Sequence, residues 1–485
     1  MSKKPNIIVF MTDQQNGDTV KTTHPAITPC IDAFKQNALH FQQTYTASPH
    51  CCPSRASFFS GLYPSEHGVW NNVEVDNSLS RGLFDDVTLF PETLDKAGYN
   101  TYFTGKWHVT ALESPAQRGF NHVLDERVTN YERCTYENKP LARDWENVYS
   151  GKKPIQMDET KKFGELVNIG YPKKSLFSVT ENPYGDRDYV RLACEAIQND
   201  TGEKPFFMYV GATGPHDPYI PPQEFLDLYK DVDIQLPPSY EDDMLDKPAL
   251  YRRTREQYKL TREECIEGIR HYLAFVSFED HLFGQVVQAV KDKGILEDTY
   301  IIYVSDHGDY LGAHRLWAKG LPSFREGYHV PLIIGGKDIK GARTTDALTA
   351  LVDIAPTIAQ MAGLDFACSG QSVLPYVQGE TPDTWRTELF TQTNGNEIYG
   401  IQRAVWNRKY KYVWNTFDYD ELYDLENDPH EMHNIATLPE NQPIIKQMCK
   451  KMWAFAKDKQ DNCTCEYIMV SLSPYGPGIL LEDEN

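Results

Sequence analysis

NIIVFMTD, at residues 6–13, is a short apolar run that ends in a polar Thr-Asp pair. YIIYVSD, at residues 300–306, shows the same pattern far along the chain, again with an Asp directly after the apolar part. Apolar runs of this length are typical of strands that are buried on both faces of a sheet. Buried strands are therefore predicted at residues 6–11, 206–210, 300–304 and 330–334.

Stretches with helical character separate these strands. The main helices are predicted at residues 188–200, 261–293 and 353–362. Strands that alternate with helices predict an α/β fold, with a mostly parallel sheet that helices cover on both faces. Because ligand sites of such sheets lie at the carboxyl ends of the strands, we expect Asp13 and Asp306 to share one active-site edge.

The composition limits the class of partner. The chain has 485 residues and a formal net charge of −21, which argues against binding to nucleic acid or to an anionic membrane, since both require a basic surface. No apolar stretch reaches the length that crosses a bilayer, and MSKKPNIIVFMTDQQ at the N-terminus has no small-residue cleavage site. A cytoplasmic location is expected, with most of the ten scattered cysteines as buried thiols.

The pattern along the chain changes near residue 374. Before it, two polar segments without a clear period, 125–174 and 215–250, are predicted to be loops over the active-site edge that shape substrate choice. After it come a strand-like stretch, RAVWNRKYKYVW, and a helical one near 444–457. We predict a catalytic α/β domain at residues 1–374 and a C-terminal α+β subdomain at 375–485, with a short antiparallel sheet and a helix.

CCPSRASFFSGLYPSEHG, at residues 51–68, carries the chemistry. Its first residues, CCPSR, stand at the front of a short predicted helix that ends near Gly61. Unpaired N–H groups at a helix N-terminus attract an anion, and Arg55 adds a guanidinium one turn into the helix. By itself the motif leaves a second interpretation open, in which Cys51 and Cys52 only pack as buried thiols.

The motif resembles the sulfatase signature C-x-P-S-R, followed by a helix and a glycine. The resemblance selects Cys51 as the cysteine that is converted to formylglycine (3-oxoalanine) and leaves Cys52 as the variable position. Further blocks resemble sulfatase segments in family order: GYNTYFTGKWH at 98–108, GPHDPY at 214–219, SDHGDYLGAH at 305–314 and ELYDLENDPHE at 421–431. The resemblance spans nearly the whole chain and implies the alkaline-phosphatase-like fold and a sulfuric ester hydrolase.

The resemblance also implies a divalent metal ion. Its expected ligands are Asp13, Gln14, Asp306, His307 and an oxygen of the modified Cys51. Many family members carry a second Asp where this chain has Gln14, and an Asn where it has His307. Calcium is the usual ion of the family and is expected here, with manganese as the alternative, because an imidazole nitrogen suits manganese or zinc better than calcium.

The implied reaction uses the two hydroxyls of hydrated formylglycine. One would attack sulfur while the alcohol leaves, which gives a covalent sulfated intermediate, and the second would then expel sulfate. Asp306 is the expected base for the attacking hydroxyl. A formylglycine-generating enzyme of the host is the implied partner during maturation.

Five further side chains receive roles from the same resemblance. Arg55 and Lys106 would orient the formylglycine and, with Lys319, bind sulfate oxygens in the transition state. His216 would protonate the leaving alcohol and His108 would assist the elimination of sulfate, since imidazole exchanges protons near neutral pH. A small-molecule or oligosaccharide sulfate ester is the expected substrate, a sulfated carbohydrate first, with aryl sulfates as surrogates.

For several polar residues near these blocks, the sequence does not decide between a place in the active site and a structural role. They are His50, His67, Asn71, Asn72 and His314. Other histidines, His24, His40, His271 and His329, are expected to be structural hydrogen bonders.

Two other functions compete with the sulfatase interpretation. TDQQ at residues 12–15 and DHG at 306–308 are similar to phosphonate monoester and phosphodiester hydrolases of the same superfamily, whereas GKWH with His108 is nearer the sulfatase pattern. The second alternative is a non-catalytic binding protein on the same fold, in which Cys51 stays unmodified. The sequence indicates neither the alcohol part of the substrate nor the oligomeric state.

Overall fold

The computed structural model describes residues 4–75, 77–125, 150–396, 398–464 and 472–483. Its main sheet has eight strands in the order β11-β2-β10-β9-β1-β8-β4-β5. These strands are β1 (Asn6–Thr12), β2 (Ala38–Phe41), β4 (Asn100–Gly105), β5 (His122–Val123), β8 (Phe206–Gly211), β9 (Thr299–Ser305), β10 (Leu332–Gly336) and β11 (Arg343–Thr345).

The sheet is mixed and mostly parallel, which confirms the predicted α/β fold. β1 lies at its centre and pairs in parallel with β8 and β9, while β10 runs antiparallel to both β9 and β2. All four predicted strands belong to this sheet. The last begins at Leu332 rather than at residue 330, after Pro331, whose nitrogen has no hydrogen to donate to the ladder.

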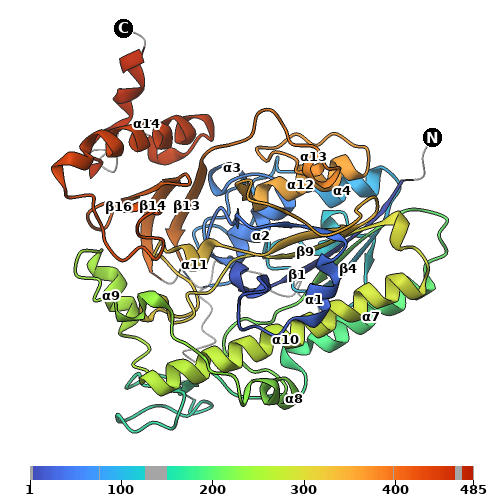
Figure 1. Cartoon of the computed structure of the whole chain (residues 1–485), viewed down its shortest axis with the longest axis horizontal. Helices are drawn as coiled ribbons and strands as arrows, with labels where there is room; N and C mark the ends of the chain where they lie inside the picture. Colours follow the sequence, from blue (N-terminus) through green and yellow to red (C-terminus); the bar gives the residue numbers. More distant parts are fainter. Residues whose placement is uncertain (1–3, 76, 126–149, 397, 465–471, 484–485) are drawn as a thin grey trace.

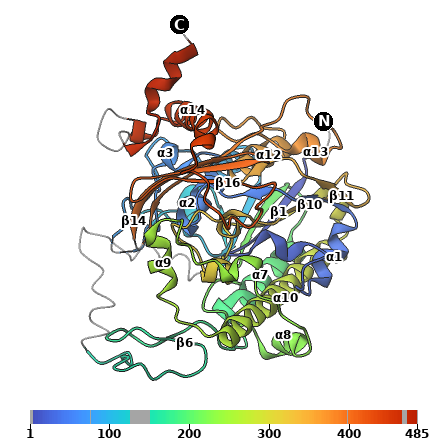
Figure 2. The same ribbon diagram turned by 60° about the vertical axis from the view of Figure 1, so that its left-hand side comes forward.

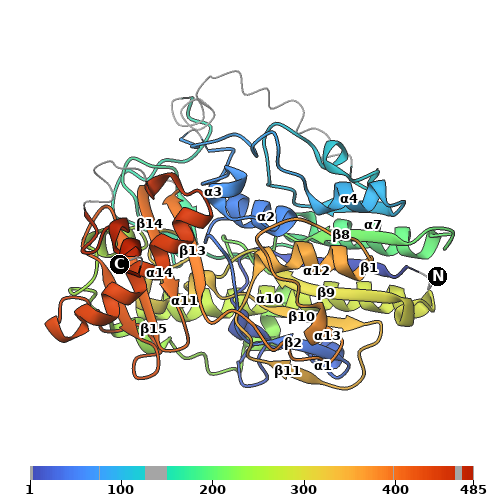
Figure 3. The ribbon, with the colours of Figure 1, turned by 90° about the horizontal axis from the view of Figure 1, so that it is seen from above.

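Helices cover both faces of the sheet (Figure 1). α1 (Pro29–Lys35), α7 (Asp186–Asn199) and α10 (Arg262–Asp292) lie on one face, and α2 (Cys51–Ser60), α4 (Phe90–Lys96) and α12 (Ile354–Met361) lie on the other (Figure 3). Alternate residues of β1 enter two different cores: Ile7 and Val9 pack with the α2 side, and Ile8 and Phe10 pack with the α10 side. The apolar character of residues 7–11 of this strand follows from burial on both faces.

The helix bounds follow local signals in the sequence. α10 begins after Thr261, whose side chain accepts from the N–H of Glu264, while the Glu264 carboxylate accepts from the N–H of Thr261. α2 ends at Gly61, which has a left-handed φ of 68°. A Cβ at this position would lie 2.7 Å from Sγ of Cys368, so glycine meets both a conformational and a steric requirement.

Short elements make up the predicted loop segments and the connections. These elements are β3 (Thr44–Tyr45), β6 (Glu165–Leu166), β7 (Lys174–Ser175), β12 (Thr349–Ala350), α3 (Pro64–His67), α8 (Gln223–Leu226), α9 (Ala249–Arg255), α11 (Arg325–Tyr328) and α13 (Leu374–Val377). The segment that contains β6 and β7 lies at the lower left in Figure 2, and Leu166 of β6 packs against a cluster that includes Ile269 and Tyr272 of α10. Of the predicted loop 125–174, residues 126–149 lie outside the described part of the chain.

A four-stranded antiparallel sheet follows, in the order β13-β14-β15-β16. Its strands are β13 (Leu389–Gly395), β14 (Tyr399–Trp406), β15 (Tyr410–Asn415) and β16 (Glu421–Asp424). α14 (Gln442–Asp458) packs on this sheet, with Trp453 against Trp414 of β15. The predicted antiparallel sheet and helix are therefore present, and the domain boundary at residue 374 stays a prediction. No helix within the described ranges is both long enough and apolar enough to span a bilayer.

Candidate active site

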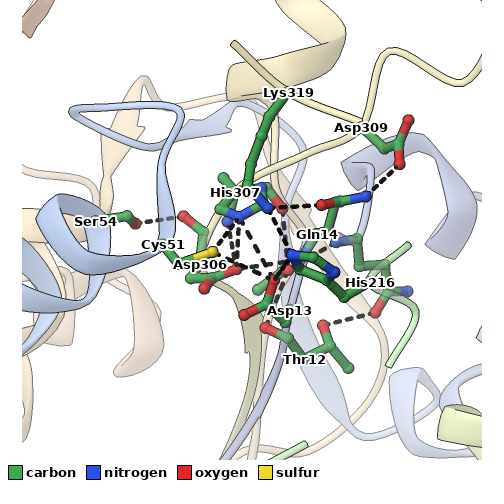
Figure 4. A network of polar contacts seen from close by, with 12 residues as sticks. Thr12, Asp13, Gln14, Cys51, Ser54, His216, Asp306, His307, Asp309 and Lys319 are labelled. Atoms are coloured by element: carbon green, nitrogen blue, oxygen red, sulfur yellow. Dashed lines mark hydrogen bonds and ion pairs between the residues drawn. The ribbon is translucent and has the colours of Figure 1, made fainter. Parts of the chain in front are cut away.

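Four buried side chains converge at the carboxyl edge of the main sheet (Figure 4). Asp13 follows β1, Asp306 and His307 follow β9, and Cys51 is the first residue of α2. One ligand atom from each of the four lies within 4.8 Å of the others. The two aspartates that follow the apolar strands therefore meet the cysteine of the CCPSR motif, as expected for strands that share one edge.

Cys51 occupies a position that favours negative charge. Its Sγ lies 3.2 Å from Nε2 of His307 and 3.8 Å from Oδ1 of Asp13. Burial acts to raise the pKa of this thiol, but Lys106, Lys319 and His307 outweigh burial and hold the pKa well below its usual value. An anionic nucleophile or a bound oxyanion is therefore stabilised at the N-terminus of α2.

Arg55 holds the two aspartates in place. Its side chain is fully buried, and it donates from Nε to Asp306 at 2.7 Å and from Nη2 to Asp13 at 2.9 Å. Nη1 donates to the hydroxyl of Tyr209 and to the carbonyl oxygen of Lys106. Each guanidinium nitrogen thus has a protein partner, and the side chain orients the carboxylates. Its predicted contact with sulfate stays a prediction.

Lys106 follows β4 and reaches the carboxylate of Asp13, which Arg55 also contacts. Its Nζ lies 2.6 Å from Oδ2 of Asp13. The preceding Gly105 has a φ of 90°, and a Cβ there would lie 2.0 Å from the carbonyl oxygen of Gly211, so only glycine lets β4 end so close to β8. Burial and Cys51 act to raise the pKa of Asp13, but Lys106, His216 and Arg55 outweigh both and hold this carboxyl ionised.

His307 directs one ring nitrogen at the cluster. Its Nδ1 donates to the carbonyl oxygen of Gly308 at 2.9 Å, which leaves Nε2 as the ring nitrogen that faces the cluster. Nε2 lies 3.5 Å from Oδ1 of Asp13 and 3.7 Å from Oδ1 of Asp306. This backbone contact is the arrangement that fixes the tautomer of a metal-binding histidine.

The donor set fits a divalent cation. Two buried carboxylates and an imidazole nitrogen surround one point, with Sγ of Cys51 standing where an oxygen of formylglycine would lie. Buried carboxylates require compensating charge, and a cation between Asp13 and Asp306 would add to what Arg55 and Lys106 supply. Carboxylate oxygens suit calcium, and the imidazole nitrogen suits manganese or zinc.

A second group of polar side chains faces the cluster from the loops after β8 and β9. Nζ of Lys319 lies 2.7 Å from Oε1 of Gln14 and 2.8 Å from Nε2 of His216. Nδ1 of His216 lies 2.6 Å from the carbonyl oxygen of Asp217, and its Nε2 is 4.0 Å from Oδ1 of Asp13. The oxygen of Gln14 thus faces Lys319, and its predicted role as a metal ligand stays a prediction.

His108 lies near Cys51 and has a neighbour, Glu74, that the sequence did not indicate. The backbone of His108 is left-handed, with a φ of 52°, and its Nε2 lies 3.7 Å from Oε2 of Glu74. His108 also contributes to the low pKa of Cys51. Within the described residues, Nδ1 of His108 and Oε1 of Glu74 are buried without a hydrogen-bond partner, so both are free to form a hydrogen bond with a polar group of a ligand.

Three further residues escaped the sequence analysis, although their positions lie within the matched blocks. Asp217 and Tyr219 belong to GPHDPY, and Asp309 belongs to SDHGDY. Asp309 accepts from the hydroxyl of Tyr219 and from Nε2 of Gln14, and Asp217 accepts from the same Nε2. The signal that could have found them is their spacing of one to three residues from predicted site residues.

The polar residues that the sequence assigned neither to the active site nor to a structural role lie in different surroundings. Asn72 accepts from the N–H of Cys52. His67 pairs with Ser57 of α2, and His314 pairs with Asp242. His50 is buried next to Cys51, and neither of its ring nitrogens has a partner among the described residues.

Comparison with known proteins gives two family matches. The family model described as Sulfatase matches residues 5–364. The model described as N-sulphoglucosamine sulphohydrolase, C-terminal, matches residues 312–458. Together they cover the main sheet, the cluster around Cys51 and the C-terminal sheet.

Individual relatives agree with these matches. The chain is 29% identical over 458 residues to choline-sulfatase of Rhizobium meliloti, which covers 90% of this chain and 83% of the relative. It is 25% identical over 526 residues to N-acetylglucosamine-6-O-sulfatase of Bacteroides thetaiotaomicron, covering 95% and 88%. Among solved structures, the phosphonate monoester hydrolase of Silicibacter pomeroyi shares the fold with a TM-score of 0.72, at 20% identity and coverage of 95% and 96%.

Proposed function

The chain belongs to the sulfatase family and is a sulfuric ester hydrolase, and we propose that it cleaves the sulfate ester of a small hydroxylated molecule. A sulfated sugar is the leading candidate substrate. The proposed reaction uses formylglycine at position 51 and a divalent metal ion. One observation supports this most strongly: Cys51 begins α2 within 4.8 Å of ligand atoms of Asp13, Asp306 and His307. The relatives named above act on choline and N-acetylglucosamine sulfates by their names, which supports a polar alcohol.

Two groups that the family implies would supply the central chemistry. Formylglycine from Cys51 would supply a geminal diol, whose first oxygen is a nucleophile toward sulfur and whose second releases sulfate and restores the aldehyde. A divalent metal ion held by Asp13, Asp306, His307 and residue 51 would act as a Lewis acid on a sulfate oxygen.

The remaining side chains bind and orient. Lys106 and Lys319 place two cations beside position 51, where they would bind sulfate oxygens as charge grows on them. Arg55 fixes the two aspartates at 2.7 Å and 2.9 Å and so keeps the ligand set rigid. Asp306 lies in this set and would accept the proton of the attacking hydroxyl.

His216 is placed to protonate the leaving alcohol. The carbonyl oxygen of Asp217 accepts from Nδ1, so Nε2 is the atom that faces the cluster. Burial and Lys319 act to lower the pKa of His216, but the carboxylates of Asp217 and Asp13 outweigh them and hold the pKa above its usual value. A raised pKa favours the imidazolium, as a general acid requires. In that form Nε2 donates, so Lys319 keeps Oε1 of Gln14 as its acceptor.

The donor set also supports a second candidate, hydrolysis of a phosphonate monoester or phosphodiester. Gln14 and His307 replace the Asp and Asn of many sulfatases, and TDQQ and DHG are similar to segments of such hydrolases. A nitrogen ligand beside carboxylates favours a transition metal over calcium. The family match and the sulfatase relatives favour an enzyme over the non-catalytic binding protein that the sequence left open.

A substrate panel tests the proposal. Protein co-expressed with a formylglycine-generating enzyme is assayed on choline sulfate, on 6-sulfated and N-sulfated glucosamine, on 4-nitrophenyl sulfate and on a phenyl phosphonate monoester. Higher kcat/KM on a sulfate ester than on the phosphonate is the expected result. The reverse order would assign the second candidate function, and no turnover of any of these esters by protein that carries formylglycine would contradict the proposal.

A further inference from the structure

We propose that Asp309 and Tyr219 are positioning residues that hold the Lys319 ammonium toward the substrate oxyanion through the side chain of Gln14, an inference that rests on the proposed function of this site. The three links are hydrogen bonds of equal length. The hydroxyl of Tyr219 donates to Oδ2 of Asp309 at 2.7 Å. Nε2 of Gln14 donates to the same Oδ2, and Nζ of Lys319 donates to Oε1 of Gln14, each at 2.7 Å (Figure 4).

The two carboxylates around Gln14 decide which way its amide points. Nε2 lies between Asp309 at 2.7 Å and Asp217 at 3.2 Å, and a carboxylate can only accept, so the NH₂ end must face them. The carbonyl end of the amide is left toward Lys319. Asp309 therefore determines, from a distance of two hydrogen bonds, that Lys319 meets an acceptor rather than a donor.

The backbone of Gln14 is fixed as firmly as its side chain. Its φ is 66°, in the left-handed region that residues other than glycine rarely adopt. The N–H of Gln14 donates to Oδ1 of Asp306 at 3.1 Å, and its carbonyl oxygen accepts from the hydroxyl of Tyr272 at 2.8 Å. An unfavourable backbone conformation held by buried partners is typical of a site that must present a side chain in one direction.

Lys319 differs from the other cations of the site in what it contacts. Arg55 pairs with two carboxylates, and Lys106 pairs with Asp13 at 2.6 Å. Lys319 contacts an amide oxygen and an imidazole nitrogen, and it makes no ion pair within 4.0 Å to any residue that the structure describes. The uncharged amide of Gln14 orients the ammonium without neutralising it, so the charge of Lys319 stays available to a sulfate oxygen.

Asp309 and Tyr219 act only through other residues. Both are fully buried, with an exposed fraction of 0%. Oδ1 of Asp309 accepts from the N–H of Leu311 at 2.8 Å, and its carbonyl oxygen accepts from Nδ2 of Asn16, so the residue is held on its far side as well. Both side chains have their polar atoms engaged by protein groups, and of the residues placed around Cys51 they contact Gln14, so we expect their influence to pass through Gln14.

A double-mutant cycle with Lys319 separates positioning from a general structural role. Asp309→Asn can donate to Gln14 and lets the amide turn, which should lower kcat/KM about tenfold, the loss expected for one hydrogen bond to a charged group. Lys319→Ala should lower kcat/KM about a hundredfold, as the loss of one oxyanion donor does. If Asp309 acts through Lys319, the double variant should be no worse than Lys319→Ala alone.

A buried pair elsewhere in the chain provides matched controls. Glu421 accepts from the hydroxyl of Tyr251 at 2.7 Å and from Asn415 at 3.0 Å, on the C-terminal sheet. Glu421→Gln and Tyr251→Phe make the same chemical changes as Asp309→Asn and Tyr219→Phe. The controls should shift the melting temperature as much as the test variants while leaving kcat/KM within about twofold, as expected of changes away from the site.

Additive losses in the double variant, or an unchanged kcat/KM in Asp309→Asn, would overturn the inference. If Asp309→Asn does not fold, Tyr219→Phe with Lys319→Ala completes the same cycle. The cycle is run on whichever ester the wild type hydrolyses, because Lys319 faces an oxyanion in sulfate and phosphonate alike. Without turnover, calorimetric titration of inorganic sulfate replaces kcat/KM. Failure of the substrate panel and failure of the cycle therefore give different results.

Discussion

Removal of the Arg55 guanidinium should destabilise the metal-free protein by an amount that follows from its contacts. In Arg55→Ala, Asp13 keeps the ion pair with Lys106 at 2.6 Å, so its charge remains compensated. Asp306 loses its cation and keeps the backbone N–H groups of Gln14 and His307 at 3.1 Å and 2.8 Å. One buried carboxylate, not two, is thus left without a counter-charge, which should lower the free energy of unfolding by about 3–5 kcal/mol.

A lysine at the same position should cost less. Arg55→Lys keeps the positive charge but loses the planar fork that reaches both carboxylates, so the expected loss is about 1.5–3 kcal/mol. A bound divalent cation would restore counter-charge to Asp306. Metal should therefore stabilise Arg55→Ala more than it stabilises the wild type.

Urea unfolding in chelator and in excess metal measures both effects. Arg403→Ala is the control, because Arg403 is buried and pairs with Asp461 at 2.5 Å and 3.0 Å on the C-terminal sheet. Arg403→Ala should lose comparable stability and gain nothing extra from metal. The assignment of Arg55 as the holder of the two aspartates would be refuted if Arg55→Ala in chelator were as stable as the wild type. It would also be refuted if metal stabilised Arg55→Ala and Arg403→Ala equally.

Three further outcomes are expected. Cys51→Ala should fold with an unchanged melting temperature and lose turnover of 4-nitrophenyl sulfate, whereas Cys52→Ser should stay active; retained activity in Cys51→Ala contradicts the nucleophile assignment. Chelation of the metal should abolish activity. In His307→Asn, activity with calcium should rise relative to activity with manganese, because an oxygen replaces a nitrogen ligand. An unchanged ratio of calcium to manganese activity argues against His307 as a ligand. Burial lowers the pKa of His67 from 6.5 to about 3, so its contribution to stability is fully present above pH 6.5 and is lost as the pH falls toward about 3. In His67→Gln, the free energy of unfolding should depend less on pH over that interval. An unaltered pH dependence would show that His67 does not titrate there.

The sequence predicts the elements of this fold well because their signals are local. Apolar runs without polar residues mark β1, β8 and β9, and burial of both sheet faces explains them. Ligand sites follow the carboxyl ends of parallel strands, and this rule places Asp13 and Asp306 together. They meet although the neighbouring Gln14 and Asp306 are 292 positions apart in the sequence. Position 51 enters the prediction through a motif, and the helix that begins there brings it to the same edge.

The partners of individual side chains are not predictable in this way. Arg55 fits an anion site by its position in the helix, yet its donors go to Asp13 and Asp306, a contact that only the packed sheet creates. Gln14 stands in the place of a metal ligand by resemblance, and its oxygen contacts Lys319, which lies 305 positions away. Glu74 carries no pattern at all, and its proximity to His108 depends on the course of a loop.

Mass spectrometry of the tryptic peptide that contains residue 51, taken from enzyme that turns over a sulfate ester, tests the central claim most directly. An aldehyde in place of the Cys51 thiol, with Cys52 unchanged, is the result that the convergence of Asp13, Asp306 and His307 on this position predicts. An intact thiol in fully active enzyme would contradict it.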